Sequence, residues 1–185
     1  MMPVVRSTTA KLIAVSLALE LVLAAQAAAI PPMMGEPIYF PRRISMGLGV
    51  ADRIVSGSSG VAFPLELTLV PLPVLTTSGG LVFSGAGVDH GYLEAGIFLF
   101  VVSVAAGAGF GAYDSTQGRK AGGALHLFVG VPVPLRDPTT AVGRQSGGTW
   151  FPYVEPYYRP SWGPWPGTVH EVGLMMRISY ALKSL

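Results

Sequence analysis

The clearest pattern along the chain is an alternation of apolar and polar or small residues in its last segment. One parity holds Val172, Leu174, Met176, Ile178, Tyr180 and Leu182. The other holds Glu171, Gly173, Met175, Arg177, Ser179, Ala181 and Lys183, among which Met175 is the one large apolar residue. Successive side chains of a strand point to opposite faces, whereas a helix would mix the two sets. The segment is therefore predicted to be a strand with one apolar and one mostly polar face.

The same alternation recurs in earlier segments. It is clear in residues 44–51, 61–69, 124–135 and 151–159, and weaker in residues 81–88. Glycine, alanine and serine are frequent on the faces opposite the apolar ones, which suits the narrow interior of a small barrel. Segments of this kind separated by turns are typical of an antiparallel up-and-down membrane β-barrel. We therefore predict an all-β fold of about eight strands.

A few charged side chains fall on the predicted strand faces: Glu66, Glu94, Glu155, Arg159, Glu171 and Arg177. An unpaired charge in a narrow, poorly hydrated interior is costly. Eight strands also leave an interior that side chains fill. We expect these carboxylates and guanidinium groups to pair across the lumen and to plug it. A polar permeation path is the alternative.

Residues 95–112 carry no charge, and this stretch raises the alternative of a transmembrane helix. The alternating Gly107, Gly109 and Gly111 disfavour a helix and suit a strand that packs closely against a neighbour. We predict strands here, either two with a tight turn near residues 103–107 or one long strand. Splitting residues 92–113 in this way gives eight strands.

Turns are predicted where polar residues, glycine and proline cluster: residues 56–60, 76–80, 114–122, 136–149 and 159–168. With eight strands, the long connection at 136–149 falls on the periplasmic side, where short turns are expected. This conflict predicts that one strand is wrongly assigned.

Prolines also resist a closed barrel. Pro132 and Pro134 share a parity, as do Pro152, Pro156 and Pro160, so each set removes ladder donors on one side of its strand. These stretches are predicted to be strand ends, loop arms outside the membrane, or the edges of an open sheet.

Aromatic residues gather near the ends of the segments: Tyr39, Phe40, Tyr113, Trp150, Phe151, Trp162 and Trp165. Such rings favour a membrane interface. Ordinary packing of loops is the alternative.

The first 29 residues have the parts of a secretory signal peptide. Arg6 and Lys11 supply positive charge, residues 12–23 form the apolar stretch, and small residues follow. Cleavage is expected after Ala27 or after Ala29, and an uncleaved anchor is the alternative. Residues 30–43 then form a Pro-rich lead-in, and residues 44–185 form the barrel domain.

Composition supports an exported membrane protein of one domain. The chain has 185 residues, of which 50% are hydrophobic and 12% charged, whereas a soluble domain carries about 25% charged residues. There is no cysteine, so disulfides and a lipoprotein anchor are excluded. The net charge of +2 comes without a stripe of Lys and Arg, which argues against a nucleic-acid partner.

No motif points to chemistry. The histidines, His90, His126 and His170, are scattered and lack a serine or carboxylate partner at a useful spacing. Asp89 is next to His90, but adjacent strand residues face opposite ways. Without cysteine, these residues do not make a zinc site. We therefore predict no catalytic residues, no cofactor-binding residues and no metal site.

Taken together, the chain resembles small bacterial outer-membrane β-barrel proteins. The last segment also looks like the assembly signal of that family, with Glu171, Gly173, Met176 and Ile178 at its spacings. Members usually end on an aromatic residue, whereas this chain runs on to Leu185. The resemblance implies the outer membrane of a Gram-negative-type bacterium, with outer-membrane lipid and the barrel-assembly machinery as partners.

The favoured hypothesis is a non-catalytic outer-membrane barrel with a structural or interaction role. One alternative is a periplasmic or surface β-sheet binding protein with an open sheet, which the prolines favour. Another is an inner-membrane protein anchored by a helix at residues 95–112.

Overall fold

The computed structural model describes residues 43–55, 58–72, 75–85, 87–99, 102–115, 118–135, 150–163 and 167–182. These residues belong to one compact unit, Tyr39–Leu185. The predicted signal peptide at residues 1–29 lies outside the described residues, as does the lead-in at 30–43 except for Arg43, where the first strand begins.

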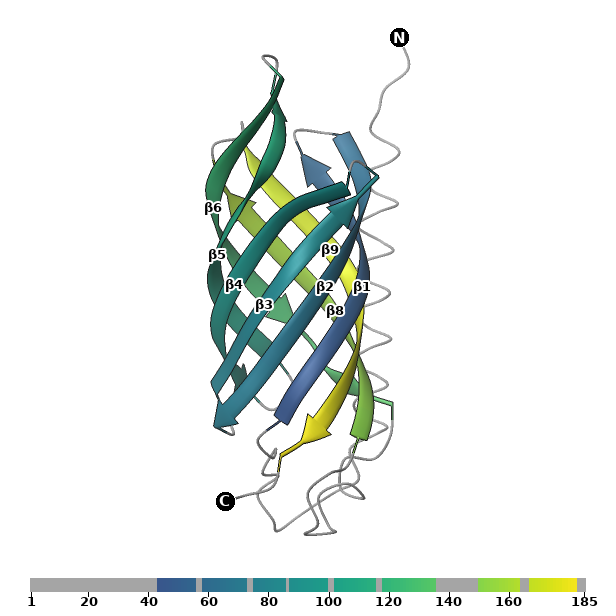
Figure 1. Ribbon diagram of the computed structural model, residues 1–185. Coiled ribbons are helices and arrows are strands. Elements are labelled where there is room, and N and C mark those ends of the chain that lie inside the picture. Colours follow the sequence, from purple (N-terminus) through teal and green to yellow (C-terminus); the bar gives the residue numbers. More distant parts are fainter. Residues whose placement is uncertain are drawn as a thin grey trace. The chain divides into compact units, whose positions relative to one another are not determined.

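The described residues form antiparallel strands that are joined in chain order (Figure 1). Their bounds are β1 (Arg43–Val55), β2 (Ser58–Leu72), β3 (Leu75–Ser84), β4 (Gly87–Leu99), β5 (Val102–Ser115), β6 (Gly118–Gly130), β7 (Val133–Pro134), β8 (Trp150–Trp162) and β9 (Thr168–Ala181). None of the described residues forms a helix long and apolar enough to span a membrane.

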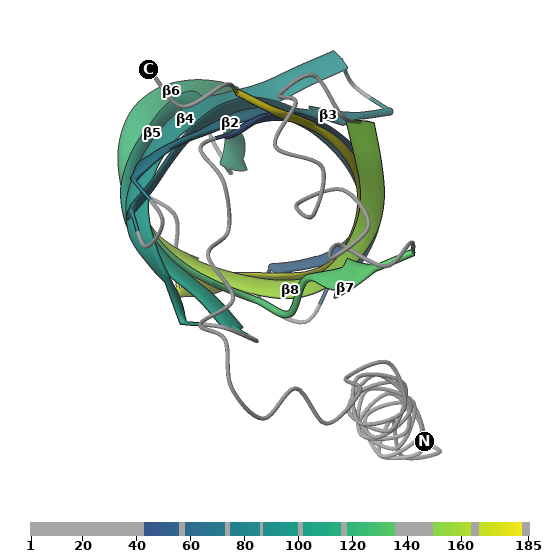
Figure 2. The same cartoon turned by 90° about the horizontal axis from the view of Figure 1, so that it is seen from below.

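The sheet closes on itself. β1 pairs with both β2 and β9, and β6 pairs with β8, so the ring of neighbours is complete (Figure 2). The two-residue β7 continues the line of β6 along β8. The fold is therefore a closed, antiparallel, eight-stranded up-and-down barrel, as predicted.

The two sets of residues that alternate in the sequence lie on the two sides of the barrel wall. In β1, residues from Arg43 to Val50 alternate between buried and exposed, and the exposed ones are apolar. Met46 and Leu48 are 61% and 63% exposed, while Arg43 and Ser45 on the other face are almost fully buried. Apolar side chains thus cover the outside, and polar, small and aromatic side chains fill the lumen.

Residues 95–112 form two strands, one of the two predicted arrangements, and the helical alternative is wrong. The turn, however, lies between Leu99 and Val102 and not at residues 103–107, because Ser103 already pairs with Phe98. Gly107 stands in the middle of β5, where a Cβ would come within 2.2 Å of the carbonyl oxygen of Leu93. Glycine is needed there for close packing and not for a turn.

Several predicted turns are shorter than expected. Residues 76–80 form no turn and lie within β3, where a Cβ on Gly80 would collide with the Tyr92 hydroxyl oxygen at 2.5 Å. The weak strand candidate at 81–88 straddles the end of β3 and the start of β4. β2 begins at Ser58, inside the predicted turn 56–60, and β8 extends to Trp162, inside 159–168. In the predicted turn 114–122, β5 extends to Ser115 and β6 begins at Gly118. Polar and glycine-rich sequence in this barrel often belongs to strands.

The strand count of eight is right, but the weak candidate at 81–88 was wrongly assigned, because it covers the end of β3 and the start of β4 and is not one strand. The connection from β7 to β8, at residues 136–149, joins the barrel at the end where β1 begins and β9 ends. Residues 136–149 themselves lie outside the described residues. The long connection between β7 and β8 therefore lies at the end of the barrel where β1 begins and β9 ends.

The prolines lie within the wall and not at the edges of an open sheet. Pro152, Pro156 and Pro160 are inside β8, which pairs with β9 along its length and with β6 and β7 on its other side. The prediction of strand ends, loop arms or open edges is therefore wrong for these residues.

Part of the predicted aromatic interface lies on the outside of the wall. Trp150 is 61% exposed, and its ring centroid lies 4.8 Å from that of Tyr180 at the end of the barrel where β9 ends. Trp162 is exposed at the opposite end. Phe151 instead points into the lumen beside Tyr153. Tyr39, Phe40, Trp165 and the side chain of Tyr113 lie outside what the structure describes.

Candidate functional site: the ion cluster in the lumen

The charged side chains predicted to pair across the lumen do so, and Arg159 is at their centre. Its Nη2 lies 3.0 Å from Glu66 Oε2, its Nε 2.9 Å from Glu94 Oε1, and its Nη1 3.0 Å from Glu171 Oε1. Nη2 also donates to the hydroxyl of Tyr92 at 2.9 Å. These partners come from β2, β4 and β9, so one guanidinium group connects three walls of the barrel.

Arg177 forms the second centre, closer to the end where β1 begins. Its Nη1 lies 2.7 Å from Glu66 Oε1 and donates to Thr68 Oγ1 at 2.8 Å, while its Nε lies 2.5 Å from Glu155 Oε2. Glu66 therefore binds both arginines, one with each oxygen. This shared carboxylate joins the two centres into one cluster.

Aromatic side chains complete the shell around Arg159. Tyr92 donates to Glu66 Oε2 at 2.6 Å, and Tyr157 donates to Glu171 Oε1 at 2.8 Å. The guanidinium carbon lies 4.1 Å from the ring centroid of Tyr92 and 5.3 Å from those of Phe128 and Tyr157. A cation held over ring faces gains attraction in addition to its ion pairs.

His126 joins the cluster through a contact that sequence reasoning missed. Its Nε2 lies 3.0 Å from Glu94 Oε1, at ion-pair distance when the imidazole is protonated. This contact and that of Arg159 Nε with the same oxygen are close but lack the alignment of hydrogen bonds. Gly107 stands between His126 and Glu94 in the register, and its missing side chain lets them meet. The sequence feature that could have predicted this contact is a glycine on one strand that pairs with a polar residue on each neighbouring strand.

The charges in the described lumen nearly balance. Four carboxylates face three guanidinium groups and one imidazole: Glu66, Glu94, Glu155, Glu171, Arg43, Arg159, Arg177 and His126, all buried. Buried ions are tolerated only when they are paired and hydrogen-bonded. Shared partners supply most of this pairing. Arg159 pairs with three carboxylates, so its removal would affect more groups than the removal of any other member.

Both ends of the cluster are closed by further side chains. Toward the start of β1, Arg43 lies over the rings of Phe98 and Tyr153, and Ser45 and Ser179 share a 2.5 Å hydrogen bond. Toward the other end, Arg53 pairs with Asp89 at 2.8 Å. These layers cap the cluster above and below.

A small enclosed cavity lies between the cluster and the Arg53 end. Its polar lining comes from Arg53, His90, His126, Ser161 and Glu171, and its volume is about 10 Å³. A space of this size holds one water molecule at most. This cavity therefore offers no room for a substrate beside the charged groups that line it.

Asp89 and His170, for which the sequence predicts no chemistry, make ordinary contacts in the structure. Asp89 binds Arg53 and accepts a hydrogen bond from Ser84. His170 lies on the outer face, stacked on Tyr158, with Nδ1 2.7 Å from the tyrosine hydroxyl. Among the described residues, no group of three or more His, Asp or Glu is arranged to hold a metal ion.

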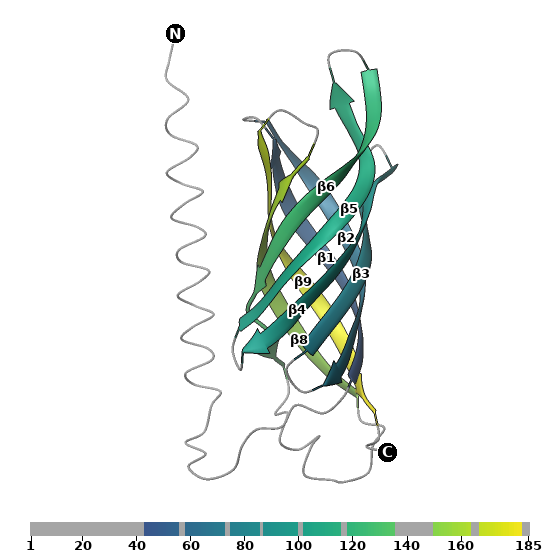
Figure 3. The same cartoon turned by 90° about the vertical axis from the view of Figure 1, so that its left-hand side faces the viewer.

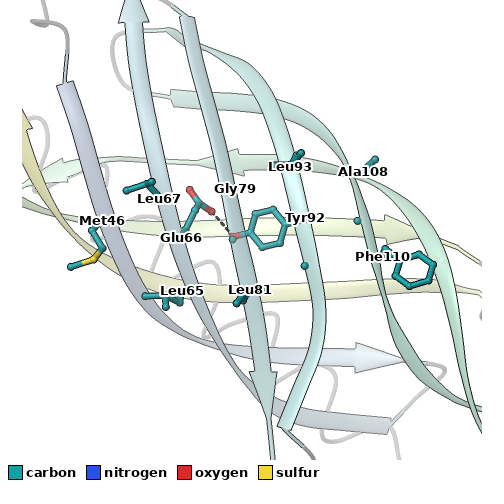
Figure 4. Close-up of a pocket in the computed structure, with 13 residues that line it drawn as sticks. Met46, Leu65, Glu66, Leu67, Gly79, Leu81, Tyr92, Leu93, Ala108 and Phe110 are labelled. Atoms are coloured by element: carbon teal, nitrogen blue, oxygen red, sulfur yellow. Dashed lines mark hydrogen bonds between the residues drawn. The ribbon is translucent and has the colours of Figure 1, made fainter.

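A shallow groove lies on the outer wall and not in the lumen. It spans β1 to β5 and encloses about 950 Å³ between exposed apolar side chains such as Leu67, Leu93 and Phe110 (Figure 4). Gly79 leaves its floor without a side chain. Glu66 and Tyr92 lie behind this floor, hydrogen-bonded to each other on the lumen side. The groove is apolar and presents no reactive group.

Comparisons with known proteins return solved β-barrel structures at low similarity and no family. No family model and no curated protein matches the chain. Among solved structures it is similar to a de novo designed transmembrane β-barrel, at 12% identity and a TM-score of 0.40 over 75% of this chain and 97% of that one. It is also similar to Ail, the attachment invasion locus protein of Yersinia pestis, solved with the heparin analogue sucrose octasulfate. That match has 15% identity and a TM-score of 0.38 over 77% of this chain and 99% of Ail.

The barrel itself is established by the strand pairing of this chain. The expected resemblance to small bacterial outer-membrane β-barrel proteins is confirmed at the level of fold. No specific family follows, and no functional residue is transferred from either structure.

Proposed function

We propose that this chain is a non-catalytic outer-membrane β-barrel with a sealed lumen and a structural or interaction role. In this proposal residues 1–29 are a cleaved signal peptide, outer-membrane lipid surrounds the wall, and the barrel-assembly machinery inserts it. The observation that carries the proposal is the inverted polarity of the barrel.

Inverted polarity fits lipid and not water. Leu93 on the outer wall is 73% exposed, whereas Arg159 and Glu66 in the lumen are 1% and 2% exposed. Soluble monomers rarely expose apolar patches larger than a few hundred Å². In hydrocarbon such a wall is satisfied, provided that the sheet closes and leaves no backbone edge. The closed pairing of the strands meets that requirement.

The filled lumen supports a role without transport or catalysis. The charged groups bind one another, and the enclosed space beside them is about 10 Å³. An eight-stranded barrel is narrow enough for side chains to fill. Solutes then have no path through the cluster, and its carboxylates and His126 are in contact with one another and with the arginines.

Fractionation of cells that express the full chain tests the location. We expect the protein in the outer-membrane fraction, shorter by the signal peptide, and migrating differently on a gel before and after boiling. An in-frame deletion of residues 1–29 is the control and should stay inside the cell. Mature protein that is soluble without detergent would overturn the proposal.

Conductance tests the sealed lumen separately. Purified barrel in planar bilayers should show no stepwise ion current. The matched variants are Arg159→Ala and Met46→Ala, which shorten a lumen residue and an outer-wall residue respectively. Current steps in the unchanged protein would contradict a sealed lumen, even if the protein fractionates with outer membranes.

A further inference from the structure

The two edges of β8 are unequal. Toward β9, every residue from Trp150 to Trp162 has a paired partner. Toward β6 and β7, pairing occurs only at Leu125, His126, Val129, Gly130, Val133 and Pro134, although one register runs through all of them. We call this interrupted line between β8 and β6–β7 the seam; Figure 3 shows the side of the barrel on which β6 lies.

Prolines cause the interruptions. Val131 N donates to Pro156 O at 3.0 Å, and Leu135 N donates to Pro152 O at 3.1 Å. A full antiparallel pair would return a second hydrogen bond, but proline has no N–H to donate. The register places Pro160 opposite Leu127 in the same relation. Every second hydrogen-bonding site along the seam therefore lacks one donor.

The lumen side of the seam is held by side chains. Arg159 of β8 contacts Glu94 and Tyr92 of β4, which is reached from β8 by crossing β6 and β5. Phe128 of β6 stacks on Tyr157 of β8, with ring centroids 5.6 Å apart. Moving β6 away from β8 would separate these groups. Side-chain contacts across the lumen thus help to hold β8 and β6 together, a role that backbone hydrogen bonds fill between the other strands.

We propose that the seam is a lateral gate, the line along which the wall opens first, and that Arg159 is its latch. Opening breaks fewer backbone hydrogen bonds than a complete ladder would hold, because Pro152, Pro156 and Pro160 donate none, and β8 keeps its complete ladder to β9. The inference goes beyond the proposed function, because it concerns how the wall moves and does not depend on cellular location.

Amide hydrogen exchange followed by NMR on the full chain in detergent micelles tests the gate. Within β8, the amides of Val154 and Tyr158 face the seam, whereas those of Tyr153 and Tyr157 face β9. A missing ladder bond lowers protection by up to about tenfold. We expect the seam amides to exchange faster than the β9-facing amides, by up to that factor. Equal protection of the two sets would overturn the proposal.

Two proline substitutions provide a matched pair. Pro156→Ala adds an N–H opposite the carbonyl of Val131 and should slow exchange along the seam. Pro134→Ala adds an N–H that points away from β8, since the neighbouring Leu135 N points toward it, and should leave the seam unchanged. An equal effect of both variants would contradict the assignment of the missing donors.

The latch has its own readout. Arg159→Met should speed exchange of the seam amides more than that of the β1–β2 amides, whereas a general loss of stability would speed both alike. The chain has no cysteine, so a Val129→Cys/Tyr158→Cys pair can lock the seam on the outer face. Oxidation should return the seam amides to the protection of the β9 edge. If the locked seam exchanges as before, opening occurs elsewhere.

Discussion

The lumen and the outer wall are built from the same strands, yet they place opposite demands on neighbouring residues. In β9, Met175 is 0% exposed in the lumen and Met176 is 55% exposed on the wall. A lumen side chain meets specific atoms across the barrel, whereas a wall side chain meets only its surroundings. We therefore expect the lumen to tolerate little change, and the wall to tolerate any apolar residue.

The largest expected effect is the loss of the central guanidinium group. Arg159→Met keeps much of the side-chain volume but leaves Glu66, Glu94 and Glu171 without that counter-ion, and removing one partner of a buried ion pair costs about 3–5 kcal/mol. Guanidinium chloride unfolding in micelles, followed by tryptophan fluorescence, measures the change.

The control for this variant is Leu93→Met on the outer wall, which should change the free energy of unfolding by less than about 0.5 kcal/mol. Similar losses in the two variants would remove the distinction between lumen and wall.

The next effect tests whether the wall demands apolar character. Leu93 lies in the middle of β4 and is 73% exposed. An arginine on the lipid face of a barrel costs about 2–4 kcal/mol at the bilayer midplane and far less near the interfaces. Leu93→Arg should therefore destabilise the barrel in lipid vesicles, and Trp150→Arg at the end of β8 should do so much less. Equal tolerance of both variants would mean that no hydrocarbon surrounds the wall.

A smaller effect comes from filling a space that the lumen needs empty. A Cβ on Gly107 would lie 2.5 Å from His126 Nε2 and 2.8 Å from Glu94 Cγ. Overpacking of this kind costs about 1–3 kcal/mol, so Gly107→Ala should lower the unfolding free energy by that amount. Gly60→Ala is the control, because nothing lies within 4 Å of the added atom. A loss in the control equal to that of Gly107→Ala would point to backbone effects instead.

Period-two patterning predicted the faces of the strands because each face has one kind of surroundings. The pairing of Glu66, Glu94, Glu155 and Glu171 with Arg159 and Arg177 followed from the cost of isolated buried charge. The contact of His126 with Glu94 did not, because it depends on register across β5 and on the absent side chain of Gly107.

Glycine and proline were the residues most easily misread. Gly79 and Gly80 looked like a turn, but in β3 their missing side chains make room for Leu93 and Tyr92. Pro152, Pro156 and Pro160 indicated an edge, and the structure places a neighbouring strand there despite the lost donors. Local propensity describes one strand alone. Glycine and proline are unfavourable within a strand, but barrel closure and packing across the lumen compensate for them here.

The smallest expected effect concerns one neutral hydrogen bond on each side of the wall. Ser45 and Ser179 pair at 2.5 Å in the lumen, where both are nearly fully buried. Either Ser→Ala change leaves a buried hydroxyl without its partner and should cost about 1 kcal/mol, whereas the double change should cost less than the sum of the two. On the outer wall, Thr77 Oγ1 is 3.4 Å from Leu69 O. Thr77→Val should change stability by no more than about 0.5 kcal/mol. A double-mutant cycle at the serines that sums to zero coupling would show that this lumen pair behaves like a wall contact.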